Sequence, residues 1–139
     1  MTAFTAQEQL YLELINRARL DPAAEAARSG INLTDLNQFI PGGTLTGEAR
    51  QPLAGNNDLL GVSRAHAAAV RASGAWNGGD PHNGAGDGTI EGRIIASDFH
   101  YQEAPRWGIG ENIAVAPVGS ADTATTLANT NHNGLFRDD

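Results

Sequence analysis

The sequence predicts an α+β fold, and two observations lead to it. Apolar residues recur at helical spacing in several stretches, whereas residues 107–116, WGIGENIAVA, alternate with the period of two that a strand requires. Ile109, Glu111 and Ile113 fall on one face of that expected strand. Because a single strand cannot form a sheet, either the loops hold further strands or the sheet continues beyond Asp139.

Helix signals are clear in the first part of the chain. Thr5-Ala6-Gln7-Glu8 is a capping box, in which the Thr5 hydroxyl and the Glu8 side chain each bond the other residue's backbone N–H. The helix that follows should end near Leu20. Asp21-Pro22 then predicts the N-cap and first residue of a second helix, which Gly30 ends. LTDLNQFI, residues 33–40, predicts one more short helical turn.

Three further helices are expected in the second part. They cover Asp58 to Ser73 with Gly74 as the stop, Thr89 to about Phe99, and ADTATTLANTN, residues 121–131. Neither an internal repeat nor a long linker interrupts the chain. We therefore expect a single domain over residues 1–139.

Composition excludes several classes of function. A net charge of −7, with nine arginines and no lysine, argues against nucleic acid as a partner. The absence of cysteine excludes disulfides, thiolate metal sites and a cysteine nucleophile. No apolar stretch is long enough to predict a membrane-spanning helix. The first residues, MTAFTAQEQL, lack the basic and apolar regions of a signal peptide.

A glycine-rich run, WNGGDPHNGAGDGTIEGRI at residues 76–94, contains the first candidate site residue, His82. Asp80, Asn83 and Asp87 are its neighbours in sequence. Imidazole nitrogen suits zinc and other transition metals, whereas carboxylates suit harder ions. The run does not match the calcium loop of EF-hands. Two interpretations stay open, a metal-binding loop and a solvent-exposed loop histidine.

Glu111 is the second candidate, because it shares a strand face with two isoleucines. A carboxylate in that position is either buried or directed into a cleft, and burial without a partner costs several kcal/mol. A bound cation would serve as the partner, and so would one of the nine arginines. Of the other histidines, His66 is expected to be a helix-face residue hydrogen-bonded to backbone, whereas His132 stays ambiguous.

Four motifs in order give the chain a resemblance to a known family. They are ELINRARLDP, PLAGNNDLLGVSRAHAAAVRASG, the glycine-rich run around His82, and WGIGENIA. Together they resemble bacterial members of the CAP superfamily, the SCP-like extracellular domains related to cysteine-rich secretory proteins, antigen 5 and plant pathogenesis-related 1 proteins. Each motif alone is weak, and it is their order over about 130 residues that is specific.

The resemblance implies a fold and a site. The fold is a three-layer α-β-α sandwich with a mostly antiparallel sheet, in a secreted, extracellular domain. The site is a cleft in which His82 and Glu111 are the catalytic and metal-binding residues, and the metal is a divalent ion, zinc ahead of calcium.

Two features of the family pattern are missing. ADTATTLANTN has neither the tryptophan nor the glutamate of the family's W-x-x-E segment. NHNGLFRDD resembles the segment that precedes the family's second cleft histidine, so that we expect this histidine and the closing strands to lie beyond Asp139. His132 is the other candidate for it. The chain would then be the N-terminal portion of the domain, with an open sheet edge that pairs with a second copy or a complementing fragment.

The functional expectation is therefore a secreted domain whose cleft binds a divalent metal through His82 and Glu111. The resemblance does not imply a reaction, because many members of the family have no established enzymatic activity. The alternatives are a non-catalytic module that binds a small lipid, a peptide or a glycan, and an adhesion or spacer domain of a larger exoprotein.

Overall fold

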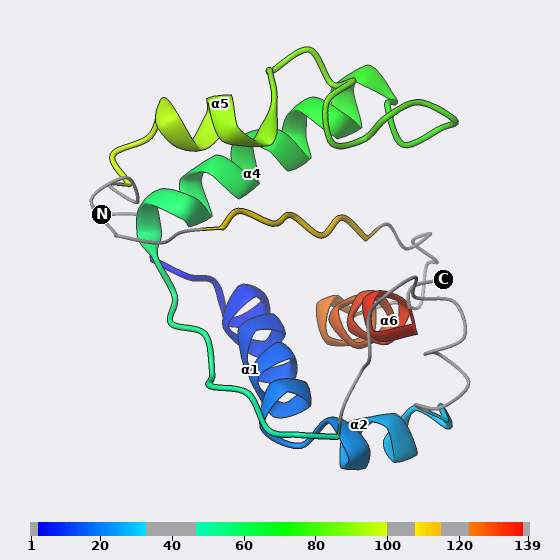
Figure 1. The fold of residues 1–139 in the computed structure, drawn as a ribbon. Coiled ribbons are helices and arrows are strands. Elements are labelled where there is room, and N and C mark those ends of the chain that lie inside the picture. The colour runs from blue at the N-terminus through cyan, green and yellow to red at the C-terminus, as the bar shows by residue number, and fades with distance from the viewer. Residues whose placement is uncertain (1–2, 33–46, 100–107, 115–122, 138–139) are drawn as a thin grey trace. The chain divides into compact units, whose positions relative to one another are not determined.

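A computed structural model describes residues 3–32, 47–99, 108–114 and 123–137. Residue contacts divide the chain into two compact units, of which unit 1 is Met1–Phe4 with Gly55–Val115 and unit 2 is Thr5–Ala54 with Ala116–Asp139. The described helices are α1 (Ala6–Leu20), α2 (Pro22–Arg28), α4 (Asn57–Ser73), α5 (Ile90–Ile95) and α6 (Ala124–Arg137) (Figure 1).

The predicted α+β sandwich is wrong for the part of the chain that the structure describes, where all regular structure is helical. Residues 108–114, within the predicted strand, form an extended segment without strand pairing (Figure 1). The physical reason is that a strand exists only through hydrogen bonds to a neighbouring strand, and no second described segment supplies them. The sequence also predicted that an open sheet edge pairs with another chain. Since the described residues form no sheet, the structure gives no support for that pairing.

The alternation that suggested a strand is nevertheless present in residues 108–114. Ile109, Glu111 and Ile113 are partly buried, whereas Gly110 and Asn112 are exposed. An extended backbone places successive side chains on opposite sides whether or not it is paired. The pattern therefore predicted the direction of the side chains correctly and the existence of a sheet incorrectly.

The helix boundaries in unit 2 follow the local signals. The capping box at Thr5 is present, with the Glu8 backbone N–H donating to the Thr5 hydroxyl at 3.2 Å and the Glu8 carboxylate accepting from the Thr5 backbone N–H at 2.7 Å. Asp21 caps α2 by accepting from the backbone N–H of Ala24 at 3.0 Å, and Pro22 is the first helical residue. Gly30 follows α2 with a φ of 65°.

In unit 1, α4 and α5 also begin at capping residues. The Asn56 side chain accepts from two backbone N–H groups of the first turn of α4, and Gly74 ends that helix in the left-handed conformation, with a φ of 68°. The α5 helix begins after Thr89 as predicted, but it ends at Ile95. It is shorter than predicted, and just beyond its end the Ser97 hydroxyl donates to the backbone carbonyl of Ile94 at 2.6 Å, a bond that competes with a further helical turn.

The last helix differs from its prediction at both ends. It spans Ala124–Arg137, and the Thr123 hydroxyl accepts from the backbone N–H of Thr126 at 3.1 Å at its start. The short turn predicted at residues 33–40 lies outside the described residues.

None of the described helices combines the length and apolarity that a membrane crossing demands.

A buried carboxylate, Glu25, joins the helices of unit 2. Its side chain is 1% exposed. Arg17 of α1 donates to it through Nε at 2.7 Å and Nη2 at 2.6 Å, and Arg28 of α2 donates at 2.7 Å. Nε2 of His132 on α6 lies 2.9 Å from Oε1, the same oxygen that accepts from Nη2 of Arg17. Contacts of three helices thus meet at one side chain, while Leu14 and Ala26 form the buried apolar part of this unit.

These donors lower the pKa of Glu25. The hydrogen bonds from Arg17 have the largest effect, those from His132 and Arg28 add to it, and the pKa falls from 4.5 to about 2 although burial opposes the shift. A carboxyl group with a depressed folded-state pKa stabilises the fold above its unfolded pKa. This stabilisation is lost as the pH falls from 4.5 toward 2.

We predict that Glu25→Gln lowers the free energy of unfolding at pH 7 by on the order of 2 kcal/mol, a value reduced because both arginines are half exposed to solvent. Urea unfolding from pH 7 to pH 2.5 measures this. The difference from the unmodified chain should shrink as the pH falls from 4.5 toward 2, because the carboxyl group of Glu25 takes up its proton in the unfolded chain before it does so in the folded one. Glu13→Gln, on the exposed side of α1, is the control and should change stability by less than about 0.5 kcal/mol. Equal effects of the two variants would contradict the prediction.

Unit 1 contains the predicted site residues. The helices α4 and α5 pack against each other, and Leu60, Val70 and Ala75 are its buried apolar residues. The glycine-rich loop connects the two helices, and residues 108–114 complete the unit.

Candidate functional site

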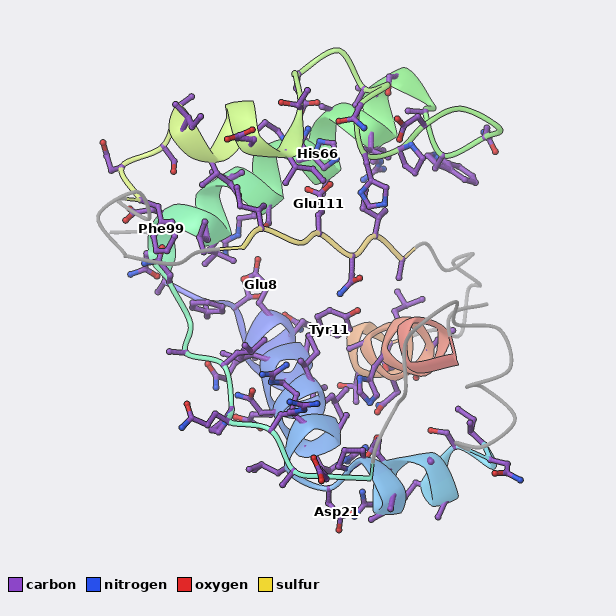
Figure 2. The ribbon with its side chains drawn as sticks, viewed as in Figure 1. Glu8, Tyr11, Asp21, His66, Phe99 and Glu111 are labelled. Carbon is purple, nitrogen blue, oxygen red and sulfur yellow. The ribbon has the colours of Figure 1, made fainter. Side chains whose placement is uncertain are left out.

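Five polar side chains of unit 1 form a connected group, here called the polar cluster. They come from α4, the glycine-rich loop, α5 and the extended segment, and they are His66, His82, Asp87, Arg93 and Glu111. Figure 2 shows Glu111 of the extended segment and His66 of α4 directed toward one another.

The two predicted site residues are in contact. Nδ1 of His82 lies 2.9 Å from Oε2 of Glu111, although 29 positions separate them in sequence. Since the partner is a carboxylate, Nδ1 carries the proton and the lone pair of the neutral ring lies on Nε2. The His82 side chain is 38% exposed and that of Glu111 is 18% exposed. The contact therefore presents an oriented imidazole toward solvent.

Arg93 is the main partner of Glu111. Its Nη2 donates to both carboxylate oxygens, at 2.9 Å and 3.0 Å. Its Nη1 donates to the backbone carbonyls of His82 at 3.0 Å and Gly88 at 2.7 Å. One buried guanidinium thus fixes the backbone of His82 and the side chain of Glu111 relative to each other. Of the partners predicted for Glu111, a cation or an arginine, the structure contains the arginine.

His66 is buried and paired with a carboxylate. Its Nδ1 lies 2.7 Å from Oδ2 of Asp87, and its side chain is 4% exposed. The hydrogen bond from His66 is the main reason that the pKa of Asp87 lies below its ordinary value. The other ring nitrogen, Nε2, is 3.5 Å from Oε2 of Glu111. The expected bond of His66 to backbone is wrong, because the loop brings Asp87 to the ring instead.

The glycine-rich loop obtains its shape from Asp80 and from its glycines. Oδ1 of Asp80 accepts from the backbone N–H groups of His82 at 2.9 Å and Asn83 at 3.3 Å, which makes a tight turn at the histidine. A Cβ atom at Gly84 would lie 2.6 Å from the carbonyl oxygen of Asp80, so this position excludes a side chain. Gly88 has a φ of 91°, a conformation that favours glycine, and its carbonyl accepts from Arg93.

The start of α5 places Arg93 in the cluster. Thr89 caps this helix by accepting from the backbone N–H of Gly92 at 3.1 Å. Arg93 follows one helical turn later, and its backbone N–H donates to the Thr89 carbonyl at 2.9 Å. The capping residue therefore determines where the guanidinium lies relative to the loop.

The polar cluster offers few donor atoms for a metal ion. Imidazole nitrogen and carboxylate oxygen are zinc ligands in proteins. In the part of the chain that the structure describes, however, no three histidine, aspartate or glutamate side chains are arranged to hold an ion together. Glu111 already accepts hydrogen bonds at both oxygens. The donor that stays accessible is the imidazole of His82, so the site supplies only part of a coordination shell.

The remaining candidates lie elsewhere. His132 contacts Glu25 in unit 2. Trp76, the first residue of the glycine-rich run, is 47% exposed. Sequence reasoning missed the roles of His66, Asp87 and Arg93, although all three lie in the motifs that carry the family resemblance. For Asp87 and Arg93 the sequence did contain a signal, because they lie on either side of the predicted helix start at Thr89 and are therefore close to each other and to the loop.

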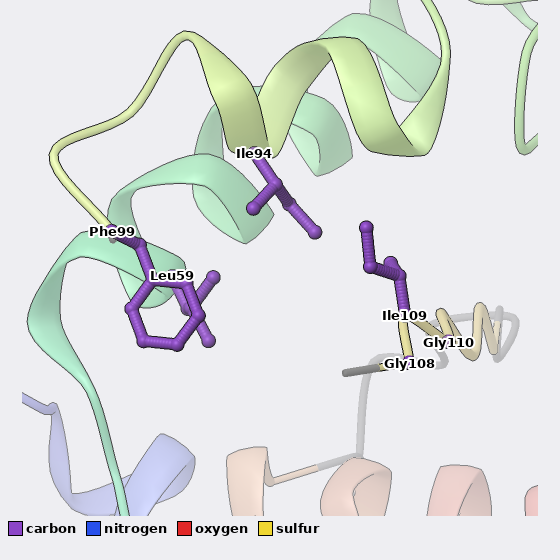
Figure 3. A pocket seen from close by; sticks show the side chains of 6 residues that line it. All are labelled: Leu59, Ile94, Phe99, Gly108, Ile109 and Gly110. Carbon is purple, nitrogen blue, oxygen red and sulfur yellow. The ribbon is translucent and has the colours of Figure 1, made fainter. Parts of the chain in front are cut away.

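An apolar pocket of about 130 Å³ lies in the same unit. Figure 3 shows its lining, which consists of Leu59, Ile94, Phe99 and Ile109 together with Gly108 and Gly110. Ile94 adjoins Arg93, and Gly110 adjoins Glu111. The same two segments, α5 and residues 108–114, therefore carry both the pocket and part of the polar cluster.

Comparison with known proteins adds no relative, because no family model, no curated protein and no solved structure matches the chain. The resemblance to the CAP superfamily accordingly rests on the four sequence motifs. Membership, the secreted location and a catalytic role of His82 and Glu111 stay predictions.

We predict that the two histidines of the polar cluster differ in their effect on stability. His66→Ala should lower the free energy of unfolding by about 2 kcal/mol, because it removes a buried ring and the hydrogen bond that this ring makes to Oδ2 of Asp87. His82→Ala should lower it by less than about 1 kcal/mol, since Arg93 still pairs Glu111. Urea unfolding at pH 7 measures both, and a larger loss for His82→Ala would contradict the assignment of His66 as the buried member.

Proposed function

We propose that unit 1 binds a divalent transition metal ion, zinc in particular, through the imidazole of His82, with Glu111 as the carboxylate that orients it. The contact between Nδ1 of His82 and Oε2 of Glu111, at 2.9 Å, carries this proposal. Metal-binding histidines characteristically donate the second ring N–H to a carboxylate or carbonyl, which fixes the ring and raises the basicity of the ligand nitrogen. His82 has this partner, and its side chain is accessible.

The other members of the polar cluster support His82 in this role. Arg93 fixes the backbone at His82, and Asp80 shapes the turn that carries it. Glu111 accepts hydrogen bonds at both of its oxygens, which suits an orienting group better than a general base. A zinc ion bound there would supply a Lewis acid with open coordination positions. We propose no reaction, because the described residues supply an incomplete ligand set.

The test is a zinc titration by calorimetry at neutral pH. We expect the unmodified chain to bind one zinc ion, and His82→Ala to lose at least about 1.4 kcal/mol of binding free energy, which is tenfold in affinity. Glu111→Gln should weaken binding by about tenfold, because it removes the orienting charge and retains the ligand.

Asn77→Ala provides the matched control for this titration. It changes an exposed residue of the same glycine-rich loop and should leave zinc binding unchanged. Zinc binding that survives His82→Ala, or that the control also abolishes, would contradict the proposal.

The apolar pocket favours a second candidate function, the binding of a ligand that carries a small apolar group. A cavity of about 150 Å³ lined by Leu, Ile and Phe is large enough to hold benzene. The pocket here, about 130 Å³, has a similar lining and suits one aromatic ring or a short branched alkyl group.

Titration with toluene, followed by methyl NMR, tests this candidate. We expect the methyl resonances of Leu59, Ile94 and Ile109 to shift in a saturable way, because these side chains line the pocket. The methyl groups of Ile95, which is 52% exposed, are the internal control and should not shift. Equal shifts at Ile95 and Ile94 would indicate surface association and would exclude the pocket as a site.

A further inference from the structure

The guanidinium of Arg93 is surrounded by oxygen atoms that belong to four residues. Both carboxylate oxygens of Glu111 accept from it, at 2.9 Å and 3.0 Å. The carbonyl oxygens of His82 and Gly88 accept at 3.0 Å and 2.7 Å. Oδ1 of Asp87 lies 3.5 Å from Nη1. Two carboxylates and two backbone carbonyls therefore converge on one permanent cation, since a guanidinium does not lose its proton in proteins.

This set of oxygen atoms has the chemistry of a site for a hard cation. Calcium takes six to eight oxygen ligands from Asp and Glu carboxylates, backbone carbonyls and water. A glycine-rich loop brings backbone carbonyls to such a site, and Gly88 does so here with a φ of 91°. The difference from a calcium site is that a side chain of the chain itself supplies the positive charge.

Unsatisfied atoms around the guanidinium give independent support. Among the described residues, Nε2 of His66, Oδ1 of Asp87 and Nε of Arg93 are buried without a hydrogen-bond partner. His66 is 4% exposed and its Nε2 is directed at Oε2 of Glu111 (Figure 2). The polar cluster therefore contains buried hydrogen-bonding atoms that Arg93 leaves without a partner. Buried polar groups in this state typically adjoin an ion or water, so Nε2 of His66 and Oδ1 of Asp87 are acceptors available to a cation that replaces the guanidinium.

We propose that Arg93 is the residue that determines which class of cation this site accepts. Its guanidinium fills the oxygen shell and excludes calcium and magnesium, and it leaves the imidazole nitrogen of His82 as the accessible donor. Transition metals bind imidazole, whereas calcium and magnesium require oxygen. The selectivity for zinc rests on the proposed function of His82, while the exclusion of calcium does not.

The experiment compares calcium binding by the unmodified chain, Arg93→Ala and Arg93→Lys, by calorimetry and by thermal unfolding with and without calcium. Arg93→Ala vacates the oxygen shell and removes the arginine from both carboxylates, so it should bind one calcium ion with a Kd of about 10⁻⁴ to 10⁻³ M, the range of weak calcium modules. Its unfolding temperature should rise with calcium. The unmodified chain and Arg93→Lys, which keep the charge, should show neither effect.

Arg71→Ala is the matched control, because it removes one positive charge from an exposed position of α4 and so changes the net charge equally. It should not bind calcium. Three results would overturn the proposal: calcium binding by the unmodified chain, calcium binding by Arg93→Lys or Arg71→Ala, or an Arg93→Ala variant that neither binds calcium nor is stabilised by it, including one that stays unfolded when calcium is added.

Zinc titration of the same samples separates this proposal from the proposed function. A chain that binds no zinc, together with an Arg93→Ala variant that gains calcium, would refute the zinc site and sustain the exclusion by Arg93. Zinc binding at His82, together with an Arg93→Ala variant that does not bind calcium, would sustain the zinc site and refute the exclusion of calcium by Arg93.

Discussion

Desolvation of a carboxylate costs several kcal/mol unless hydrogen-bond donors replace the lost water, and arginine is the donor best matched to its two oxygens. In unit 1 this constraint determines much of the structure. Glu111 lies on an extended segment without strand pairing and is largely removed from solvent. Arg93 donates to both of its carboxylate oxygens through Nη2, and to two backbone carbonyls of the loop through Nη1. The cap at Thr89, the positive φ at Gly88 and the turn at Asp80 all serve to bring the loop within reach of that guanidinium.

Unit 2 meets the same constraint in a different way. Glu25 is closed off by donors from three helices and is 1% exposed, so its role is structural. Glu111 retains one neighbour, His82, that is 38% exposed. The carboxylate of Glu111 contacts an accessible imidazole and can therefore influence how that imidazole binds a ligand. The carboxylate of Glu25 contacts no accessible imidazole, so its hydrogen bonds only stabilise the packing of the helices. This difference, rather than the number of charged groups, makes the polar cluster the candidate site.

Local signals made the start or end of several helices predictable, whereas the predicted α+β sandwich is wrong for the described residues. Capping residues act within one helical turn, so the sequence predicted the helix starts and ends at which they lie. These residues are Thr5, Asp21, Gly74 and Thr89. Strand pairing depends on distant segments, and for that reason the alternation around Glu111 predicted side-chain direction but not the absence of a sheet. The meeting of His82 with Glu111 was expected from the family resemblance. The choice of Arg93 among nine arginines was not predictable, because spacing does not specify which charges meet across a loop, and the same limit applied to Glu25.

The bond between Glu25 and His132 spans 107 positions, and unit 2 is assembled from segments on both sides of unit 1 in the sequence. During synthesis, α1 and α2 emerge first, and Arg17 and Arg28 are then already present to pair the carboxylate. The third helix of the unit arrives only after all of unit 1 has been made. Completion of unit 2 therefore requires closure of a long loop, which is a slow kind of contact to form. Until that closure, the pairs with Arg17 and Arg28 are the contacts of Glu25 that the segments already made can supply.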